Sequence, residues 1–226
     1  MAVEVGLSGR DVLVFGASGA LGNAVAAYFA NMGASVRGAN RHEPAAGDRL
    51  TGVTYEAVDV TDDDALRRLF DATAPPWAVI STVGGYALKH SLAELDPAEL
   101  QHQLEVNLLS AALICKHALR VMKPVGRGRI VLTASRSATD TARAGFAYSV
   151  SKLGVLHLTS MAADEVRGTG ITVNCVVPSI IDTPVNRAAL PNANHDAWPK
   201  ARDIANSYVY LASPDAGLVN GAAIPV

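Results

Sequence analysis

The chain has 226 residues, of which 50% are hydrophobic and 5% aromatic, and its formal net charge is −2. This length suits one large α/β domain with an aliphatic core, and we expect residues 1–226 to form it. A near-neutral charge without a basic block argues against nucleic acid and against an anionic membrane surface as partners. The two cysteines and six scattered histidines predict buried, reduced thiols and no metal site.

The sequence shows no sign of membrane insertion or export. No stretch reaches the ~18 apolar residues that a transmembrane helix needs. Residues 1–9 lack a basic region followed by an apolar run, so no secretory signal is predicted. We therefore expect a cytoplasmic protein.

Apolar runs and helical patterns alternate along the whole chain. The predicted strands are residues 11–15, 34–39, 53–58, 77–82, 129–134, 171–177 and 222–226. The predicted helices are residues 20–32, a segment opening at 62–64, and residues 97–122, 143–167 and 200–211. Continuous apolar strands that alternate with helices are typical of a parallel sheet covered on both faces. Right-handed crossovers then give a Rossmann-type doubly wound sheet of about seven strands.

One long stretch, residues 178–199, is predicted to be irregular because it contains four prolines. It follows the carboxyl end of a predicted strand, where ligands bind in sheets of this kind. It is either a loop that covers a substrate or an ordinary exposed connection, and the sequence leaves both open.

A glycine-rich turn, Gly16–Gly22, joins the first predicted strand to the first predicted helix. Glycines allow a tight turn and a close approach to a pyrophosphate, and the helix N-terminus offers free N–H groups. The spacing is GxxGxxG. The residues expected to hold the phosphates are Gly16, Ser18, Gly19, Ala20, Leu21 and Gly22.

The end of the second strand bears on the choice between NAD and NADP. An NAD site usually places an acid here, but residues 37–42 contain none, and Arg41 is placed to meet a 2′-phosphate. The sequence therefore favours NADP(H) over NAD(H), with Asn40 and Arg41 beside the ribose; the alternative is that Arg41 and His42 form a solvated turn. After the third strand, Asp59 either accepts from the adenine amino group or caps the next helix.

The stretch from Ser135 to Lys152 carries the most specific chemistry. Tyr148 and Lys152 are four residues apart on a predicted helix, so their side chains share one face. A neighbouring ammonium favours phenolate and is expected to lower the pKa of Tyr148, which suits a proton donor or acceptor. Ser135, at the end of a strand, can bind the same reacting oxygen. A tyrosine and a lysine at this spacing also occur on ordinary helices, so the pair alone does not establish catalysis.

The glycine turn, Asp59, Asn107, Ser135, Tyr148 and Lys152, in this order, resemble the short-chain dehydrogenase/reductase family over nearly the whole chain. The resemblance implies that Tyr148 is the general acid/base, that Lys152 holds the nicotinamide ribose, and that Ser135 orients the substrate carbonyl. It implies that Asn107 holds a water in a proton relay. The other cofactor contacts that it implies are Val60, Val83, Gly84, Tyr148, Lys152, Pro178, Ile181 and Thr183.

Residues 182–187, Leu190, Pro191 and Trp198 resemble the dihydropteridine reductase branch of that family. Ser135 and Arg41 depart from that branch, whose members typically lack the serine and tend to use NADH. We therefore expect hydride transfer between NADPH and a small carbonyl or alcohol substrate. The alternatives are a dihydropteridine-type reductase of a quinonoid or imine substrate, and a non-catalytic dinucleotide-binding sensor.

The resemblance also implies a homodimer or homotetramer built on the helices at 97–122 and 143–167. The aliphatic residues of the first helix either face such an interface or pack on the sheet, and the sequence leaves this open. They are Leu104, Leu108, Ala111, Ala112 and Leu119.

Overall fold

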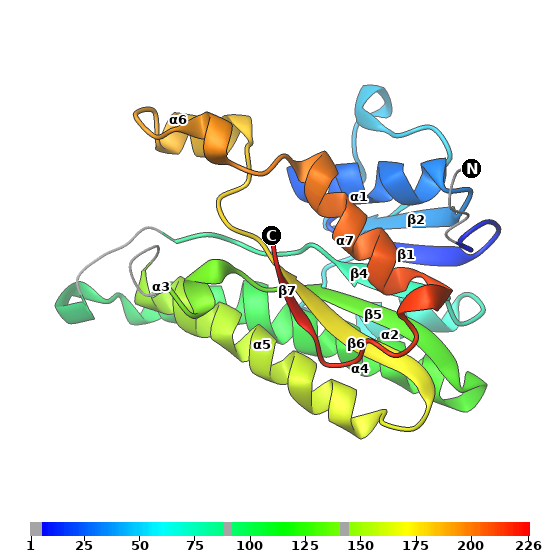
Figure 1. Cartoon of the computed structure of the whole chain (residues 1–226). Helices are drawn as coiled ribbons and strands as arrows, with labels where there is room; N and C mark the ends of the chain where they lie inside the picture. Colours follow the sequence, from blue (N-terminus) through cyan, green and yellow to red (C-terminus); the bar gives the residue numbers. More distant parts are fainter. Residues whose placement is uncertain (1–5, 88–91, 141–144) are drawn as a thin grey trace.

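A computed structural model of the chain describes residues 6–87, 92–140 and 145–226. Seven parallel strands form one sheet in the order β3-β2-β1-β4-β5-β6-β7 (Figure 1). The strands are β1 (Asp11–Phe15), β2 (Ser35–Asn40), β3 (Val53–Ala57), β4 (Ala78–Ser81), β5 (Arg127–Thr133), β6 (Gly170–Val177) and β7 (Ala223–Pro225). The predicted Rossmann-type doubly wound sheet is confirmed.

The strand order places a crevice at the centre of the sheet. β1 pairs with β2 on one side and with β4 on the other, so the chain reverses direction across the sheet at this point. In such sheets, ligands bind outside the carboxyl ends of the strands at the reversal. The glycine turn follows β1 directly, and the loop from Thr82 follows β4.

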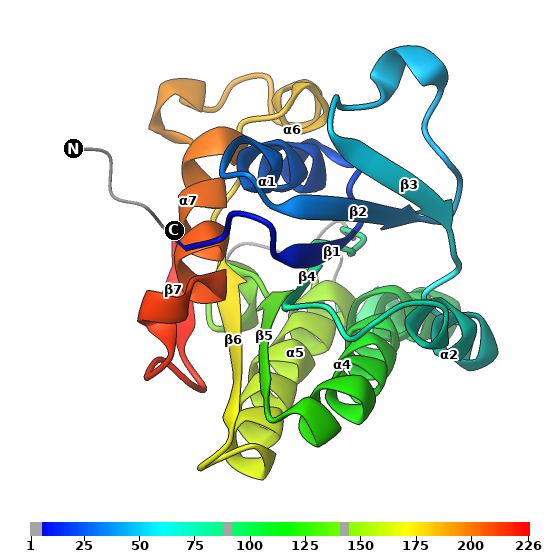
Figure 2. The same cartoon turned by 90° about the vertical axis from the view of Figure 1, so that its right-hand side faces the viewer.

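Helices cover both faces of the sheet (Figures 1 and 2). The helices are α1 (Ala20–Asn31), α2 (Asp63–Asp71), α3 (Pro97–Gln103), α4 (Ser110–Met122), α5 (Phe146–Glu165), α6 (Pro184–Ala189) and α7 (Ala201–Ala212). α1 and α7 pack on one face, around Phe29 and Tyr208. α2, α4 and α5 pack on the other, around Phe70 and Met122. Residue 143, where the helix that corresponds to α5 was predicted to start, lies outside the described residues.

The predicted helix at 97–122 contains a change of winding. α3 leads into a π-helical segment, Leu104–Leu109, which continues as α4. The wider turn carries Asn107, which is 1% exposed, and such π segments are frequent at functional sites. Of the aliphatic residues left open by the sequence, Ala111 and Leu119 are buried in the core beneath the sheet.

The stretch at 178–199 is more ordered than predicted. Thr183 caps α6 by accepting a hydrogen bond from the N–H of Asn186, and Pro184 stands in the first turn, a combination that starts helices. The N–H of Asp182 donates to the carbonyl oxygen of Pro199 at 2.9 Å, which ties the two ends of the segment together. The prediction of an irregular stretch is therefore wrong for α6, which Figure 1 shows projecting beyond the sheet.

Candidate active site

The turn between β1 and α1 is built for a group that approaches the backbone closely. Gly16 has a φ of +80°, which side chains rarely adopt, and a Cβ on Gly22 would lie 2.0 Å from the carbonyl oxygen of Gly16. Gly19 precedes the first turn of α1, whose N–H groups have no side-chain cap. These free N–H groups and the absence of side chains fit a pyrophosphate.

Thr82 fixes this turn against β4. Its hydroxyl donates to the carbonyl oxygen of Phe15 at 2.9 Å, and a Cβ on Gly16 would lie 2.8 Å from its Oγ1 atom. Thr82 thus joins the ends of β1 and β4 at the mouth of the crevice. This bond could not be predicted from the sequence because it links residues 67 positions apart.

Asn40, at the end of β2, holds the other side of the turn. Its Oδ1 atom accepts hydrogen bonds from the backbone N–H and the hydroxyl of Ser18, both at 2.9 Å. The side chain is 6% exposed, and its Nδ2 atom is buried without a hydrogen-bond partner. An orphaned donor beside a phosphate turn fits a ribose hydroxyl or a phosphate oxygen.

Arg41 and Asp59 lie next to Asn40 on the surface. The Arg41 Nε and Asp59 Oδ2 atoms are 3.7 Å apart, and the side chains are 62% and 44% exposed. Asp59 Oδ1 accepts from the hydroxyl and the N–H of Thr61, and these bonds, followed by the charge of Arg41, lower the pKa of Asp59. Asp62, not Asp59, caps α2, so the helix-cap alternative for Asp59 is wrong. Val60 is buried beside it.

The predicted serine, tyrosine and lysine meet at the carboxyl edge of β5. Tyr148 and Lys152 lie on α5, and the hydroxyl of Ser135 is hydrogen-bonded to that of Tyr148. Lys152 is 3% exposed and donates from Nζ to the carbonyl oxygen of Thr133 at 3.0 Å. Gly84, after β4, lies against this lysine: a Cβ there would be 2.8 Å from the Nζ atom.

Burial controls the pKa values of this group. It raises the pKa of Tyr148; the hydrogen bond from Ser135 lowers it, and the nearby Tyr86 raises it. Burial also lowers the pKa of Lys152 from 10.5 to about 8. The expectation that Lys152 lowers the pKa of Tyr148 is wrong in this geometry, because the ammonium donates to Thr133 and burial dominates.

Asn107 connects the π segment to the loop after β4 and to α5. Its Oδ1 atom accepts from the N–H of Gly85 at 3.0 Å, and its Nδ2 atom lies 3.1 Å from the carbonyl oxygen of Gly85. Nδ2 also has Gln103 Oε1 at 2.9 Å and Ser151 Oγ at 3.0 Å as acceptors. Asn107 thus holds three segments of the site in register. The water relay that the resemblance implies stays a prediction.

The remaining predicted residues frame the same edge. Pro178 accepts from the N–H of Arg136 at 3.0 Å, and the carbonyl oxygen of Ile181 accepts from Asn186 Nδ2 at 2.8 Å. Thr183 is occupied as the cap of α6. Val83 packs against the core beneath α4 and α5. The structure therefore gathers all the predicted site residues along one edge of the sheet.

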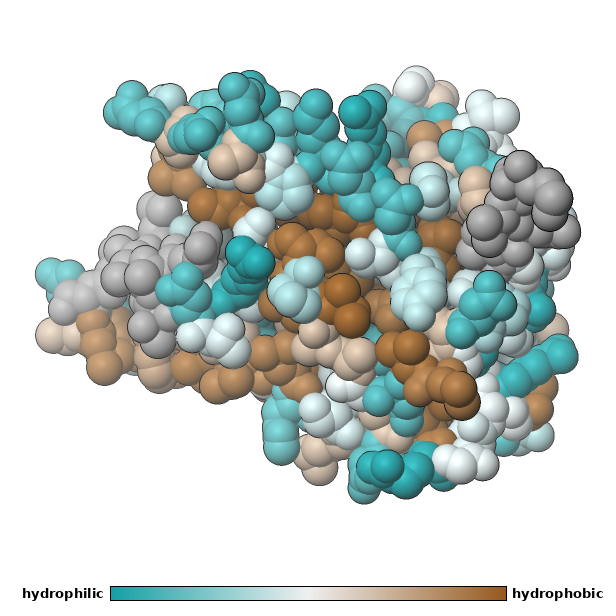
Figure 3. Space-filling view, viewed as in Figure 1, coloured by the Kyte–Doolittle hydropathy of each residue, from teal (hydrophilic) through white to brown (hydrophobic). Residues whose placement is uncertain are grey.

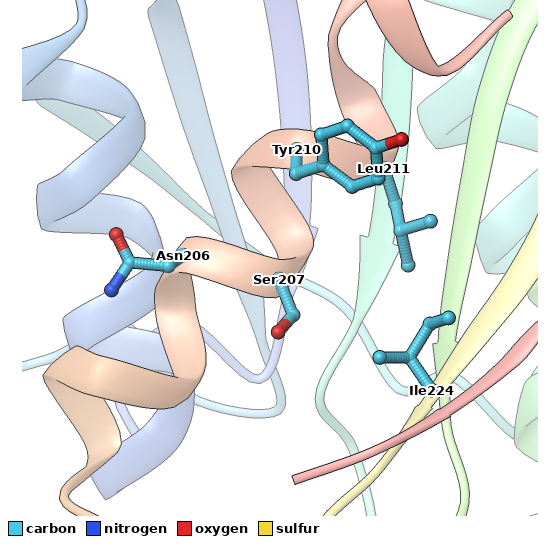
Figure 4. A pocket seen from close by; sticks show the side chains of 5 residues that line it. All are labelled: Asn206, Ser207, Tyr210, Leu211 and Ile224. Carbon is cyan, nitrogen blue, oxygen red and sulfur yellow. The ribbon is translucent and has the colours of Figure 1, made fainter.

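A separate hollow lies on the opposite face of the sheet from α5. It has a volume of about 290 Å³ and is lined by Asn206, Ser207, Tyr210, Leu211 and Ile224 of α7 and β7 (Figure 4). None of the predicted site residues lines it. Within the described ranges, no helix is long and apolar enough to cross a membrane, and no three His, Cys, Asp or Glu side chains cluster around a possible metal position.

Sequence reasoning missed several residues that shape the site. Gln103 and Ser151 bind Asn107, and Tyr86 packs against Tyr148 with the ring centroids 5.2 Å apart. A signal was available for Tyr86, which directly follows the glycine pair after β4. No such signal existed for Gln103 and Ser151, because a polar residue on a helix is common.

Comparisons with known proteins agree with this architecture. Residues 16–226 match the family described as enoyl-(acyl carrier protein) reductase. The chain is 33% identical to cis-4-hydroxycyclohexanecarboxylate dehydrogenase of Sinomonas cyclohexanicum, over 96% of this chain and 94% of that protein. It is 30% identical to the 3-oxoacyl-(acyl-carrier-protein) reductase FabG of Vibrio cholerae, over 97% of this chain and 96% of that protein.

Solved structures give the same result. A short-chain type dehydrogenase/reductase from Mycobacterium ulcerans superposes with a TM-score of 0.90 at 28% identity, covering 98% of this chain and 89% of that one. One from Burkholderia xenovorans, described as putative, has a TM-score of 0.89 at 30% identity, covering 97% and 95%. The chain therefore belongs to the short-chain dehydrogenase/reductase family of oxidoreductases, which use NAD(P)(H) and act on small molecules.

Proposed function

We propose that the protein is an NADPH-preferring oxidoreductase that interconverts a small carbonyl compound and its alcohol, with Tyr148 as the general acid/base. The observation that carries the proposal is the meeting of Ser135, Tyr148 and Lys152 at one edge of the sheet. The glycine turn that fits a pyrophosphate lies on the same edge. A site that only bound a dinucleotide would not need this arrangement.

The dinucleotide, when bound, supplies or accepts the hydride. The hydroxyl of Ser135 holds the substrate oxygen, and Tyr148 gives that oxygen a proton in reduction or removes one in oxidation. A raised pKa keeps Tyr148 protonated at neutral pH, which suits reduction. Lys152, almost fully buried and close to Gly84, is placed to bind the ribose beside the nicotinamide.

The preference for NADPH rests on the end of β2. Arg41 stands here without an acid on the strand end, and its only ion pair in the described part of the chain is the 3.7 Å contact with Asp59. An exposed guanidinium with so weak a partner is free to turn toward a 2′-phosphate, which it binds through two N–H groups.

The substrate is not transferred from the relatives, because their names cite different compounds. The relatives include dehydrogenases of borneol, D-threitol and cis-4-hydroxycyclohexanecarboxylate as well as an oxoacyl reductase. What these names share is the exchange of an alcohol and a carbonyl. We therefore propose only the reaction that is consistent with all of these names, the interconversion of an alcohol and a carbonyl group on a small molecule.

We also propose that the chain forms a homodimer or homotetramer through α5 and the adjoining π segment. Phe146, Leu153 and Met161 are exposed at intervals of seven and eight residues on α5, so they share one side of the helix. Leu109 of the π segment is exposed as well, and Figure 3 shows hydrophobic residues gathered along the side of the molecule that carries α3 and α5. Light scattering of the purified protein measures the assembly directly.

The proposal is tested by measuring binding and turnover of NADPH and NADH with ketones, quinones and dihydropteridines. Reduction of a ketone with NADPH in preference to NADH is the expected result. Turnover confined to a quinonoid pterin would replace it with a dihydropteridine-type reductase. Tight dinucleotide binding without turnover of any substrate would instead establish a sensor.

A further inference from the structure

Tyr86 is a large aromatic residue in the loop after β4, and 58% of its surface is exposed. Its ring lies edge-on to that of Tyr148, with the centroids 5.2 Å apart and the planes at 67°. An aromatic side chain that is mostly exposed contributes little to the core, yet this one contacts the residue proposed to move the proton. Its free surface therefore borders the space in which a substrate of Tyr148 must sit.

The backbone on both sides of Tyr86 is held in place. The N–H and the carbonyl oxygen of Gly85 are both bound by the Asn107 carboxamide, at 3.0 and 3.1 Å. A Cβ on Gly85 would meet Val106 at 3.1 Å, and Ala87 is only 6% exposed. The chain is therefore hydrogen-bonded at Gly85 and packed at Ala87, while the Tyr86 ring is largely exposed. A wall that is already ordered loses little conformational freedom when a ligand packs on it.

An aromatic wall beside the reacting carbon discriminates between substrates by shape. A flat or puckered ring places many atoms against the aromatic ring at once and has few rotatable bonds to fix. An open chain of the same size makes fewer contacts and loses more rotamer freedom. The edge-on contact with Tyr148 also sets the distance from this wall to the reacting oxygen.

We propose that Tyr86 is a specificity-determining residue that favours substrates whose reacting carbonyl or alcohol carbon lies in, or next to, a ring. This inference rests on the proposed function, since it assumes that the substrate reaches Tyr148. It adds the class of substrate and a residue that selects it.

The test compares cyclohexanone with hexan-3-one, two ketones of six carbons each, in the wild type and in the variants Tyr86→Phe and Tyr86→Ala. With NADPH, Tyr86→Ala is expected to lower kcat/KM for cyclohexanone about three- to tenfold, mostly through KM, and to change that for hexan-3-one less than about twofold. Tyr86→Phe keeps the ring and is expected to keep the preference. An equal loss on both ketones, no loss on either, or a changed affinity for NADPH would overturn the proposal.

Failure of the proposed function has a different appearance. If the wild type reduces no ketone of the panel, the proposed reaction is refuted, and saturation-transfer NMR of cyclohexanone with the NADPH-bound protein decides the role of Tyr86. Cyclohexanone signals that are present with the wild type and Tyr86→Phe but lost with Tyr86→Ala would support the proposed contact between Tyr86 and the substrate ring. Signals that are absent from the wild type, or equal in all three proteins, would reject it.

Discussion

The two ends of the site are held in opposite ways. The tyrosine end, which we define as Asn107, Ser135, Tyr148 and Lys152, is mostly buried: Tyr148 is half-buried and the other three are buried. Hydrogen bonds connect it to a strand and a helix distant in the sequence. The arginine end, defined as Arg41 and Asp59, is exposed and joined by one contact of 3.7 Å. Exposed ion pairs of this kind contribute about 0–1 kcal/mol.

The difference separates what each end can do. Proton transfer needs groups fixed within tenths of an ångström, and buried hydrogen bonds provide that precision at a cost in desolvation. Recognition of a phosphate needs a charge that can adjust, and an exposed guanidinium provides it. Substitutions at the tyrosine end should therefore alter rate and stability, whereas those at the arginine end should alter only the choice of dinucleotide.

The largest effect is expected from Tyr148→Phe. It removes the hydroxyl proposed to move the proton and keeps the ring in place, so kcat should fall about 10³-fold while NADPH affinity changes little. Steady-state turnover and fluorescence titration with NADPH measure the two quantities. Tyr210→Phe on α7, another partly exposed tyrosine far from α5, is the matched control and should retain full activity. Unchanged turnover in Tyr148→Phe would refute the mechanism.

Lys152→Met should make the protein more stable and less active. A pKa near 8 in place of 10.5 means that burial disfavours the charged form by about 3 kcal/mol. The variant also loses the hydrogen bond to Thr133, which offsets part of this energy. We therefore expect a net gain of about 2 kcal/mol in the free energy of unfolding of Lys152→Met at pH 7 without dinucleotide. Urea unfolding measures this gain.

The pH dependence of that gain provides a second check. Between pH 8 and 10.5 the unfolded chain keeps the Lys152 proton while the native protein has lost it. The unfolding free energy of the wild type therefore rises with pH across this window, and the advantage of Lys152→Met should shrink. Lys116→Met, which removes an exposed lysine paired with Asp63, is the control and should not stabilise the protein. A gain that is independent of pH would contradict the burial argument.

Most of the fold could be predicted because the central strands are buried on both sides. Such strands read as continuous apolar runs: the strand predicted at 77–82 is Ala78–Ser81, and that at 11–15 is Asp11–Phe15. The start of α2 was equally readable from its three consecutive aspartates. α6 was missed although Thr183 and Pro184 form an ordinary helix start, because four prolines suggested an irregular loop.

The order of strands and helices also predicted that the site residues share one edge of the sheet, but it did not predict their contacts. The π segment cannot be read from Leu104–Leu109, which has an ordinary helical composition; the contacts of Asn107 lie 22 residues away at Gly85 and 44 away at Ser151. The direction of the Lys152 ammonium depends on a backbone carbonyl of β5. Such properties are set by tertiary structure, so spacing along one helix could not give the sign of the Tyr148 pKa shift.

Arg41→Ala tests the arginine end. A guanidinium bound to a 2′-phosphate contributes about 1.5–3 kcal/mol, so the preference for NADPH over NADH should fall about 10- to 100-fold. The melting temperature without dinucleotide should stay the same, because the side chain is 62% exposed. Arg49→Ala, which removes a similarly exposed arginine paired with Glu43, should leave the preference unchanged. An unaltered preference in Arg41→Ala would show that another group determines the choice between NADPH and NADH.

The smallest effect is expected from Asp59→Asn, and it isolates the charge of the pair. The amide keeps an oxygen to accept the two bonds from Thr61, so the turn should persist, while the negative charge beside Arg41 disappears. The preference for NADPH over NADH should rise about two- to fivefold. Any contact of residue 59 with adenine is common to both dinucleotides, so its loss cancels in this ratio. Asp64→Asn on α2, an exposed acid nearby, is the control. A lower ratio would mean that Asp59 positions Arg41 for the phosphate and does not compete with it.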